Sequence, residues 1–209
     1  MMLVGGVMVN PPAFFDWLYR RPWYGEMLRQ WAFDLPDLPD GPGARVLELG
    51  CGPGGLTRDM TLQGWQVTGV DQSPAMIKKA QGIDGPSFVQ ADALNLPFAD
   101  GEFDVVLSAS LVNLVPDRVA LFASMARVLR PGGVASVLFP TPDFTPDRAK
   151  VQADRLPILS GGALQLWSGK APQCDPKKVM QEAAAAGLVR GVCTQTGVDG
   201  VVAVTAWAA

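Results

Sequence analysis

The sequence has no histidine among its 209 residues. Imidazole titrates nearest to neutral pH, so its absence excludes a Ser-His triad, a histidine general base and a histidine metal ligand. Cysteine is also scarce. Cys51, Cys174 and Cys193 are odd in number and widely spaced, which matches neither a disulfide framework nor a zinc site. We therefore expect no metal, and a reducing, cytoplasmic compartment is the simpler interpretation.

Charge of either sign is limited. The 17 Lys and Arg residues stand against 20 Asp and Glu, a net charge of −3, which offers no electrostatic footprint for DNA or RNA. No apolar run is long enough to span a bilayer, so no membrane insertion is expected. The apolar start, residues 1–9, lacks the basic region of a signal peptide and is interpreted as a flexible arm or strand-like lid.

Apolar periodicity divides the chain into a helical start and an alternating body. Apolar residues within 14–33 recur at spacings of three and four positions, with a break near Pro22, which predicts one or two helices. Beyond a linker rich in proline and glycine, strands are predicted near 45–49, 66–70, 86–90, 103–109, 133–139, 189–195 and 201–207. Helices are predicted near 55–63, 74–81, 117–130 and 175–187.

This alternation predicts an α/β fold in one domain. The first five strands form βαβ units, and the short turn 197–200 allows only an antiparallel pair. We expect a doubly wound, mostly parallel seven-stranded sheet with a C-terminal antiparallel hairpin and helices on both faces. An aromatic helical cap (1–40) precedes a binding core (44–139), an insertion for the acceptor (140–174) and a final helix and hairpin (175–209). The proline-rich insertion is assigned no helix, and it is too long for an ordinary connection.

The most informative segment is VLELGCGPGG, residues 46–55. An apolar run containing Glu48 is followed by glycines at alternate positions (Gly50, Gly52, Gly54) and then by a helix. This layout is typical of a nucleotide site at the end of a parallel strand. A literal G-x-G-x-x-G exists, but Pro53 removes an amide donor and Glu48 adds negative charge. Both favour a cationic or zwitterionic ligand over a diphosphate; a tight turn without a ligand is the alternative.

Polar residues end the next three strands. Asp71 lies 21 residues after Gly50 and can accept hydrogen bonds from both ribose hydroxyls. The alternative role for Asp71 is to cap the helix that follows, but Ser73 suffices as that cap. Asp92 follows the third strand and can accept from an adenine amine, or simply belongs to a surface turn. Ser108 and Ser110 end the fourth strand, where Ser110 serves equally well as a helix cap.

Together these segments resemble the class I S-adenosylmethionine-dependent methyltransferases, closely over about 44–139 and loosely elsewhere. The matching segments are VLELGCGPGGLT (46–57), VTGVDQSPAMI (67–77), FVQADALNLPF (88–98), FDVVLSASLVNLVPD (103–117) and RVLRPGGV (127–134). The resemblance implies S-adenosylmethionine as cofactor, S-adenosylhomocysteine as product and a small-molecule acceptor. It also implies the contacts of the cofactor: its methionine end with Glu48, Gly50, Cys51, Gly52 and Gly54, its ribose with Asp71 and Gln72, its adenine with Met76, Asp92 and Ala93, and its ammonium with the Ser108 carbonyl.

The acceptor side is less defined. Members that act on small molecules often carry histidine where this sequence has Asn113-Leu114, and Asn113 can hydrogen-bond but cannot titrate. Methyl transfer from a sulfonium mainly requires alignment, so no catalytic residue is assigned. If a base exists, the candidates are Asp16, Asp143, Asp147 or a tyrosine. The aromatic content of 10–33 and 140–174 predicts an apolar or aromatic acceptor that contacts Trp17, Tyr19, Tyr24 and Trp167. Packing of these rings in the core is an equally favoured alternative.

Two other functions stay open at this point. An NAD(P)-dependent oxidoreductase would use the same strand, turn and helix, although Pro53 and Glu48 argue against it. A non-catalytic regulatory protein that binds S-adenosylmethionine would share the whole fold, so the fold does not separate it from an enzyme.

Overall fold

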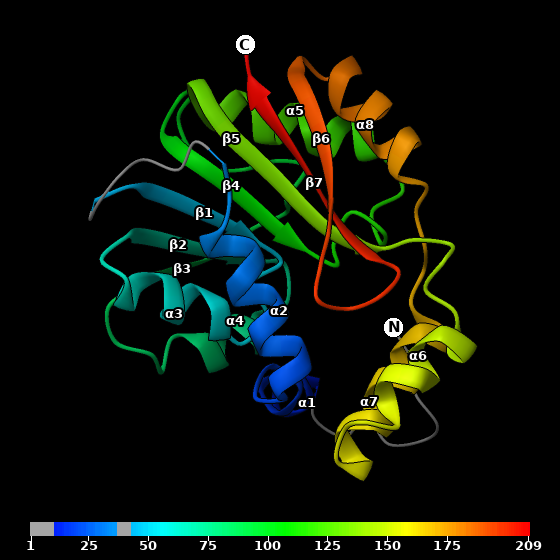
Figure 1. Cartoon of the computed structure of the whole chain (residues 1–209). Coiled ribbons are helices and arrows are strands. Elements are labelled where there is room, and N and C mark those ends of the chain that lie inside the picture. The colour runs from blue at the N-terminus through cyan, green and yellow to red at the C-terminus, as the bar shows by residue number, and fades with distance from the viewer. Residues whose placement is uncertain (1–10, 37–42) are drawn as a thin grey trace.

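The computed structural model describes residues 11–36 and 43–209, so the expected N-terminal arm lies outside the described residues. Its centre is a seven-stranded sheet in the order β3-β2-β1-β4-β5-β7-β6 (Figure 1). The parallel strands are β1 (Arg45–Leu49), β2 (Gln66–Asp71), β3 (Ser87–Gln90), β4 (Phe103–Ala109) and β5 (Leu129–Pro140). β7 (Val201–Ala208) runs antiparallel to both β5 and β6 (Leu188–Gln195). The predicted α/β fold is confirmed.

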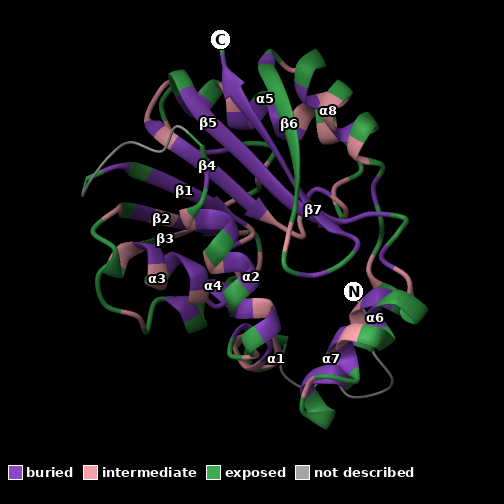
Figure 2. Cartoon of the chain, in the orientation of Figure 1, coloured by how far each residue is buried: buried purple, intermediate pink, exposed green. Residues whose placement is uncertain are grey.

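Helices cover both faces of this sheet. α1 (Pro11–Tyr19), α2 (Pro22–Phe33), α3 (Gly55–Leu62) and α4 (Pro74–Ala80) lie on one side, and α5 (Arg118–Val128) and α8 (Pro176–Ala185) lie on the other. Successive strand residues point to opposite faces, so Val46 joins the cluster under α2 while Leu47 joins the cluster under α5. Figure 2 shows the central strands buried and the edge strand β6 largely exposed.

The N-terminal helices are fixed to the body by polar contacts as well as apolar ones. Trp31 Nε1 in α2 donates to Ser136 Oγ of β5 at 2.9 Å, and Ser136 pairs with Thr205 at 2.9 Å. Tyr19 at the end of α1 donates its hydroxyl to Asp59 of α3 at 2.6 Å. The break at Pro22 therefore separates two helices: α1 is joined to α3, and α2 is joined to the sheet through Ser136.

The insertion is helical, contrary to the assignment of no helix to 140–174. It contains α6 (Pro146–Ala153) and α7 (Ile158–Lys170). Its prolines begin helices rather than break them, because proline is favoured in a first turn: Pro146 starts α6 and Pro157 immediately precedes α7. Gly161 allows the two helices to pack closely, since a Cβ there would lie 2.5 Å from the Ala153 carbonyl oxygen.

Candidate active site

A pocket of about 290 Å³ opens at the carboxyl ends of the parallel strands. The loop after β1 forms its floor, and the loops after β2 and β3 form one end. The other end is made by α1, α2 and the segment that follows β4. Parallel strands bring these segments together because their carboxyl ends share one edge of the sheet.

The glycine loop depends on backbone conformations that other residues adopt at a cost. Gly50, Gly52 and Gly54 have φ angles of 71°, 54° and 83°, in the left-handed region that glycine adopts without strain. A Cβ on Gly54 would also lie 2.7 Å from the ring of Phe88. The alternate glycines of the sequence therefore allow the chain to turn sharply from β1 into α3.

The amide groups of this loop are already paired. Gly50 and Cys51 donate to the Val70 carbonyl at 2.8 and 2.9 Å, Gly52 donates to Asp71 Oδ2 at 3.0 Å, and Gly54 donates to the Cys51 carbonyl at 3.0 Å. Pro53 has no amide hydrogen to offer. From Gly50 to Gly54 the loop thus has no amide left for a pyrophosphate, which a dinucleotide site would need.

Asp71 is held in place by two backbone amides. Its carboxylate accepts from Gly52 N at 3.0 Å and from Ser73 N at 2.8 Å. A carboxylate has about four acceptor positions, so two stay available for a diol. Ser73 caps α4 by accepting from Met76 N at 3.4 Å, as the sequence indicated, and Asp71 is not needed for that role.

The pocket is electrostatically negative. Glu48, Asp71 and Asp92 line it, and no Lys or Arg is among the described residues that do so. Glu48 is 4% exposed, and burial raises the pKa of its carboxyl group to about 7, with the charge of Asp71 adding to the rise and the Thr57 hydroxyl opposing it. Burial, with Glu48 and Asp71, also raises the pKa of the Cys51 thiol far above its usual range, so this thiol stays neutral.

At the end made by α1, α2 and the segment after β4 the lining is largely apolar. Phe15, Leu28, Leu111 and Leu114 contribute apolar side chains, and Tyr24 and Ser110 contribute hydroxyl groups. Burial raises the pKa of Tyr24 to about 12, with the neighbouring Ser110 side chain lowering it and Glu48 raising it further. Tyr24 is therefore protonated at neutral pH and acts as a hydrogen-bonding group rather than a base.

Ser110 has an uncommon conformation. Its φ of 55° lies in the left-handed region, which is rare outside glycine and is concentrated at functional sites. Its buried Oγ makes no hydrogen bond to the described part of the chain. The alternative of a helix cap is wrong for this residue, because Asp117 caps α5 by accepting from Ala120 N at 2.9 Å.

Comparison with known proteins decides the family. A model of the methyltransferase domain family matches residues 47–137, the stretch that contains the glycine loop and both strand-end acids. Residues 47–137 therefore form a methyltransferase domain, in agreement with the resemblance to the class I S-adenosylmethionine-dependent methyltransferases. The negative pocket, with its paired loop amides, fits this cationic cofactor.

The chain is similar to curated proteins and to solved structures. The 2-methyl-6-phytyl-1,4-hydroquinone methyltransferase of Synechocystis sp. is 35% identical over 61% of this chain and 41% of its own length. The phthiotriol/phenolphthiotriol dimycocerosates methyltransferase of Mycobacterium tuberculosis is 43% identical over 50% of this chain and 39% of its own. The chain thus spans about two fifths of these two relatives. A possible histamine N-methyltransferase of Thermotoga maritima, 19% identical, superposes with a TM-score of 0.67 over 97% of this chain and 96% of its own, which shows the shared fold.

Most of the residues assigned to the cofactor line the pocket. The lining includes Glu48, Gly50, Cys51, Gly52, Asp71, Gln72, Met76, Asp92 and Ala93. Two assigned residues do not line it. Gly54 lies beneath the loop against Phe88, and the Ser108 side chain is buried, donating to the Leu49 carbonyl at 3.1 Å. Their neighbours Gly55, Ala109 and Ser110 line it instead.

The residues assigned to the acceptor are divided. Tyr19 and Tyr24 line the pocket, whereas Trp17, Asn113 and Trp167 do not. Trp17 stacks on Phe14, and Trp167 lies behind Tyr24 with 5.6 Å between ring centroids. The aromatic pattern did not separate lining rings from packing rings, because both recur at the same helical spacing. The lining residues that sequence reasoning missed include Leu28, Leu56, Val70, Leu111 and Val115, which are ordinary core residues by type.

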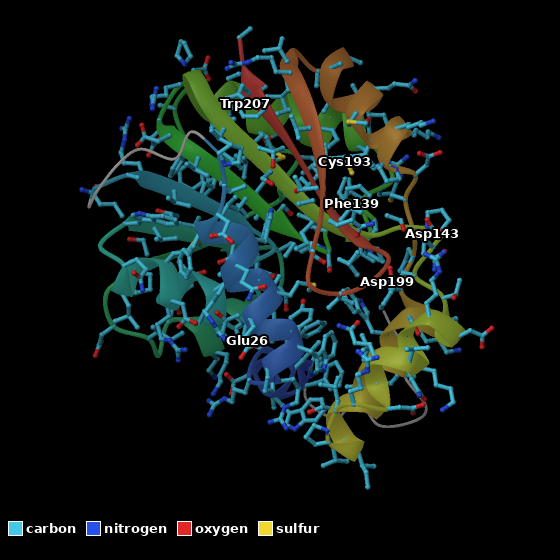
Figure 3. The ribbon with its side chains drawn as sticks, in the orientation of Figure 1. Glu26, Phe139, Asp143, Cys193, Asp199 and Trp207 are labelled. Carbon is cyan, nitrogen blue, oxygen red and sulfur yellow. The ribbon has the colours of Figure 1, made fainter. Side chains whose placement is uncertain are left out.

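Of the suggested bases, the two tyrosines line the pocket and the three aspartates do not. Asp16 pairs with Arg20 at 3.0 Å. Asp143 lies on the segment from β5 to α6, 3.7 Å from Arg148 (Figure 3), and Asp147 belongs to the first turn of α6. Burial and Asp59 raise the pKa of Tyr19 far above its usual range. The aspartates are therefore not placed to deprotonate an acceptor in the pocket, and the raised pKa of each tyrosine keeps its hydroxyl protonated at neutral pH.

Proposed function

We propose that this chain transfers the methyl group of S-adenosylmethionine to a small, rather apolar or aromatic acceptor. The observation that carries the proposal is the chemistry of the pocket lining: three carboxylates and no cation among the described residues, together with apolar side chains and the hydroxyls of Tyr24 and Ser110. Bound S-adenosylmethionine would supply a sulfonium methyl group whose carbon an aligned nucleophile attacks, with S-adenosylhomocysteine as the leaving group. The contribution of the protein is then to position the two molecules and exclude water.

In this proposal the cofactor residues keep the roles that the family resemblance implies. Glu48 and the glycine loop hold the methionine end, with the Ser108 carbonyl receiving the ammonium. Asp71 receives the ribose hydroxyls beside Gln72, and its orientation by two amides supports this role. Asp92 and Ala93 hold the adenine edge near Met76. Asp92 uses Oδ1 to accept from Leu94 N at 2.9 Å, which keeps its carboxylate in the turn beside the pocket.

The acceptor lies at the end formed by Phe15, Leu28 and Leu114. Tyr24 and Ser110 orient its polar group by hydrogen bonding, since neither titrates near neutral pH. Two relatives are named for a phytyl hydroquinone and for phthiotriol or phenolphthiotriol dimycocerosates, which supports an apolar acceptor. The insertion forms an outer wall: α6 and α7 belong to the same apolar cluster as α1 and α2, and Trp167 contacts Tyr24.

The cysteines and the pocket also bear on the cellular compartment and on the two competing functions. All three cysteines are free thiols, which supports the proposal of a reducing, cytoplasmic compartment. An NAD(P)-dependent oxidoreductase is disfavoured, because the amides between Gly50 and Gly54 are paired and the pocket lining is negative. A regulatory protein that binds the cofactor without catalysis differs from an enzyme only in the use of the acceptor end.

The cofactor role is tested by calorimetry with S-adenosylhomocysteine and with NADH. Asp71→Ala is expected to lower affinity for S-adenosylhomocysteine at least tenfold without unfolding the protein, because two charge-assisted hydrogen bonds are lost. Asp199→Ala, in the exposed β6–β7 turn (Figure 3), is the matched control and should retain affinity. Unchanged affinity in Asp71→Ala would remove Asp71 from the ribose role, and binding of NADH alone would refute the proposed cofactor.

The transfer itself is tested with S-adenosylmethionine labelled in the methyl group. A panel of phenols, hydroquinones, amines and carboxylic acids, each with alkyl chains of increasing length, is incubated with the protein, and label in the extracted products is counted. We expect transfer to improve with the apolar surface of the acceptor. Tight binding of the cofactor with no transfer to any member of the panel would favour the regulatory function.

A further inference from the structure

The outer side of α7 is apolar and uncovered. Ile158 is 91% exposed, Leu159 is 71% exposed, and Leu166, two turns further on, is partly exposed. Val151 on the neighbouring α6 is also exposed. Figure 2 shows this exposure at the lower end of the α6–α7 pair, which projects from the body beside α1. Large apolar side chains gathered on one free helix face usually mark an interaction surface.

This face is not needed to hold α7 in place. The opposite side of the helix is buried through Ser160, Gly161 and Leu164, and Gly161 lies directly against α6. Trp167 packs against Trp23, Tyr24 and Phe144, with ring centroids 4.8–5.8 Å apart. The helix is therefore anchored from within, and its exposed leucine and isoleucine face outward from a fixed support.

The charges within the α7 segment have one sign. Between Asp154 and Asp175 the only charged residues are Arg155 and Lys170. These two cations lie just before the helix and at its last residue, and neither forms an ion pair within the described ranges. α6 differs, because it carries both signs and pairs Lys150 with Asp154 at 2.8 Å.

We propose that α7 binds the surface of a lipid bilayer that contains anionic lipids. Ile158, Leu159 and Leu166 enter the boundary between headgroups and acyl chains, while Arg155 and Lys170 contact lipid phosphates at the two ends of the helix. An apolar helix face flanked by cations is the pattern of helices that lie in the membrane interface. No helix in the described part of the chain is long and apolar enough to cross a bilayer, so this contact is peripheral.

The position of α7 would bring the bound bilayer close to the acceptor end of the pocket. The same helix presents Trp167 to Tyr24, which lines the apolar end of the pocket. A bilayer against the outer side of α7 thus lies close to the end of the pocket assigned to the acceptor, where an apolar acceptor would be concentrated. This use rests on the proposed function, whereas the surface binding does not.

Vesicle sedimentation without cofactor or acceptor tests the surface binding. The full chain is mixed with vesicles of phosphatidylcholine alone or with one third phosphatidylglycerol. We expect the wild type to sediment with the mixed vesicles and to be released by salt, since headgroup contacts are screened. I158E/L159E should lower the partition coefficient at least tenfold. The matched control is Leu62→Glu, because Leu62 is 75% exposed on α3 and should be replaceable without effect.

Further variants separate the two components of the contact. R155Q/K170Q should reduce the preference for anionic vesicles at least threefold, and I158S/L159S should weaken binding as I158E/L159E does without adding charge. Circular dichroism checks that each variant is folded. No sedimentation of the wild type, or equal sedimentation of wild type and I158E/L159E, would overturn the proposal. Self-association of the wild type that I158E/L159E abolishes, without vesicle binding, would assign the face to a second copy and would also overturn it. Because S-adenosylhomocysteine binding is measured separately, failure here leaves the proposed function standing.

Discussion

Replacing Glu48 with glutamine tests how burial controls the charge of the pocket. The Glu48 carboxyl is 4% exposed and accepts a hydrogen bond from Thr57 Oγ1. Burial is the main cause that raises its pKa from 4.5 to about 7, and the negative charge of Asp71 adds to it. Glutamine has nearly the same shape and keeps an oxygen that can accept from Thr57, but it cannot ionise. Glu48→Gln therefore removes the titration while preserving the packing.

The sign of the effect follows from proton binding in the two states. Between pH 4.5 and about 7 the unfolded chain has lost the Glu48 proton, whereas the folded protein retains it. The free energy of unfolding of the wild type must then fall as pH rises through this window, and level off above it. A pKa raised from 4.5 to about 7 corresponds to about 3 kcal/mol, because each pKa unit is worth about 1.4 kcal/mol.

Urea unfolding of the two proteins without ligand, from pH 4.5 to 8.5, measures this contribution. The other titrating groups are common to both, so they largely cancel in the difference. Glu48→Gln should gain up to about 3 kcal/mol over the wild type as pH rises, with most of the gain below about pH 7. Glu26→Gln, on the exposed side of α2 (Figure 3), controls for loss of a surface carboxylate. A difference between Glu48→Gln and wild type that does not change with pH would refute the reasoning.

Three further predictions concern the same pocket and its supports. The affinity of the wild type for S-adenosylmethionine should rise with pH up to about 7 and then level off, since a cationic ligand favours ionised Glu48, and titration calorimetry should show no such dependence in Glu48→Gln. Tyr24→Phe should lower kcat/KM about tenfold for the best acceptor while cofactor affinity changes less than twofold, because one hydrogen bond to the acceptor is lost; an equal loss of cofactor affinity would contradict the assignment. Gly54→Ala should destabilise the fold by at least about 1 kcal/mol, given its left-handed φ and the nearby Phe88 ring. Gly162→Ala, in open space within α7, should instead stabilise it by up to about 1 kcal/mol in thermal or urea unfolding.

Most of the residues that the sequence proposes for the cofactor line the pocket. Asp71 and Asp92 follow successive strands, and the glycine loop follows the first, so a parallel sheet must bring all three to one edge. Each strand was visible as a short apolar run between turn signals, and its register did not need to be known. The exceptions, Gly54 and Ser108, lie next to residues that line the pocket, which is a one-residue difference that strand periodicity alone does not resolve.

The acceptor half was only partly predictable. The aromatic helices were recognised, but Tyr24 and Trp167 differ in role because of a contact between α2 and α7 that joins residues far apart in the chain. The insertion was interpreted as irregular because its prolines and glycines are loop signals in most contexts. In the structure Pro146 and Pro157 stand at helix starts and Gly161 at a close crossing, and these positions favour the same residues.

By itself the sequence determined the seven strands, their mostly parallel arrangement, the family resemblance and the acidic residues of the pocket. Hydrophobic periodicity and motif spacing are local properties, so they can be read without the tertiary structure. The tertiary structure alone decided that the loop amides are paired, that Ser110 is left-handed with a free hydroxyl, and that α7 shows an apolar face to the outside. These features depend on contacts between distant segments, such as Tyr19 with Asp59 and Trp31 with Ser136. Which side chains a packed helix buries, and which it leaves exposed, is set by its neighbours in space.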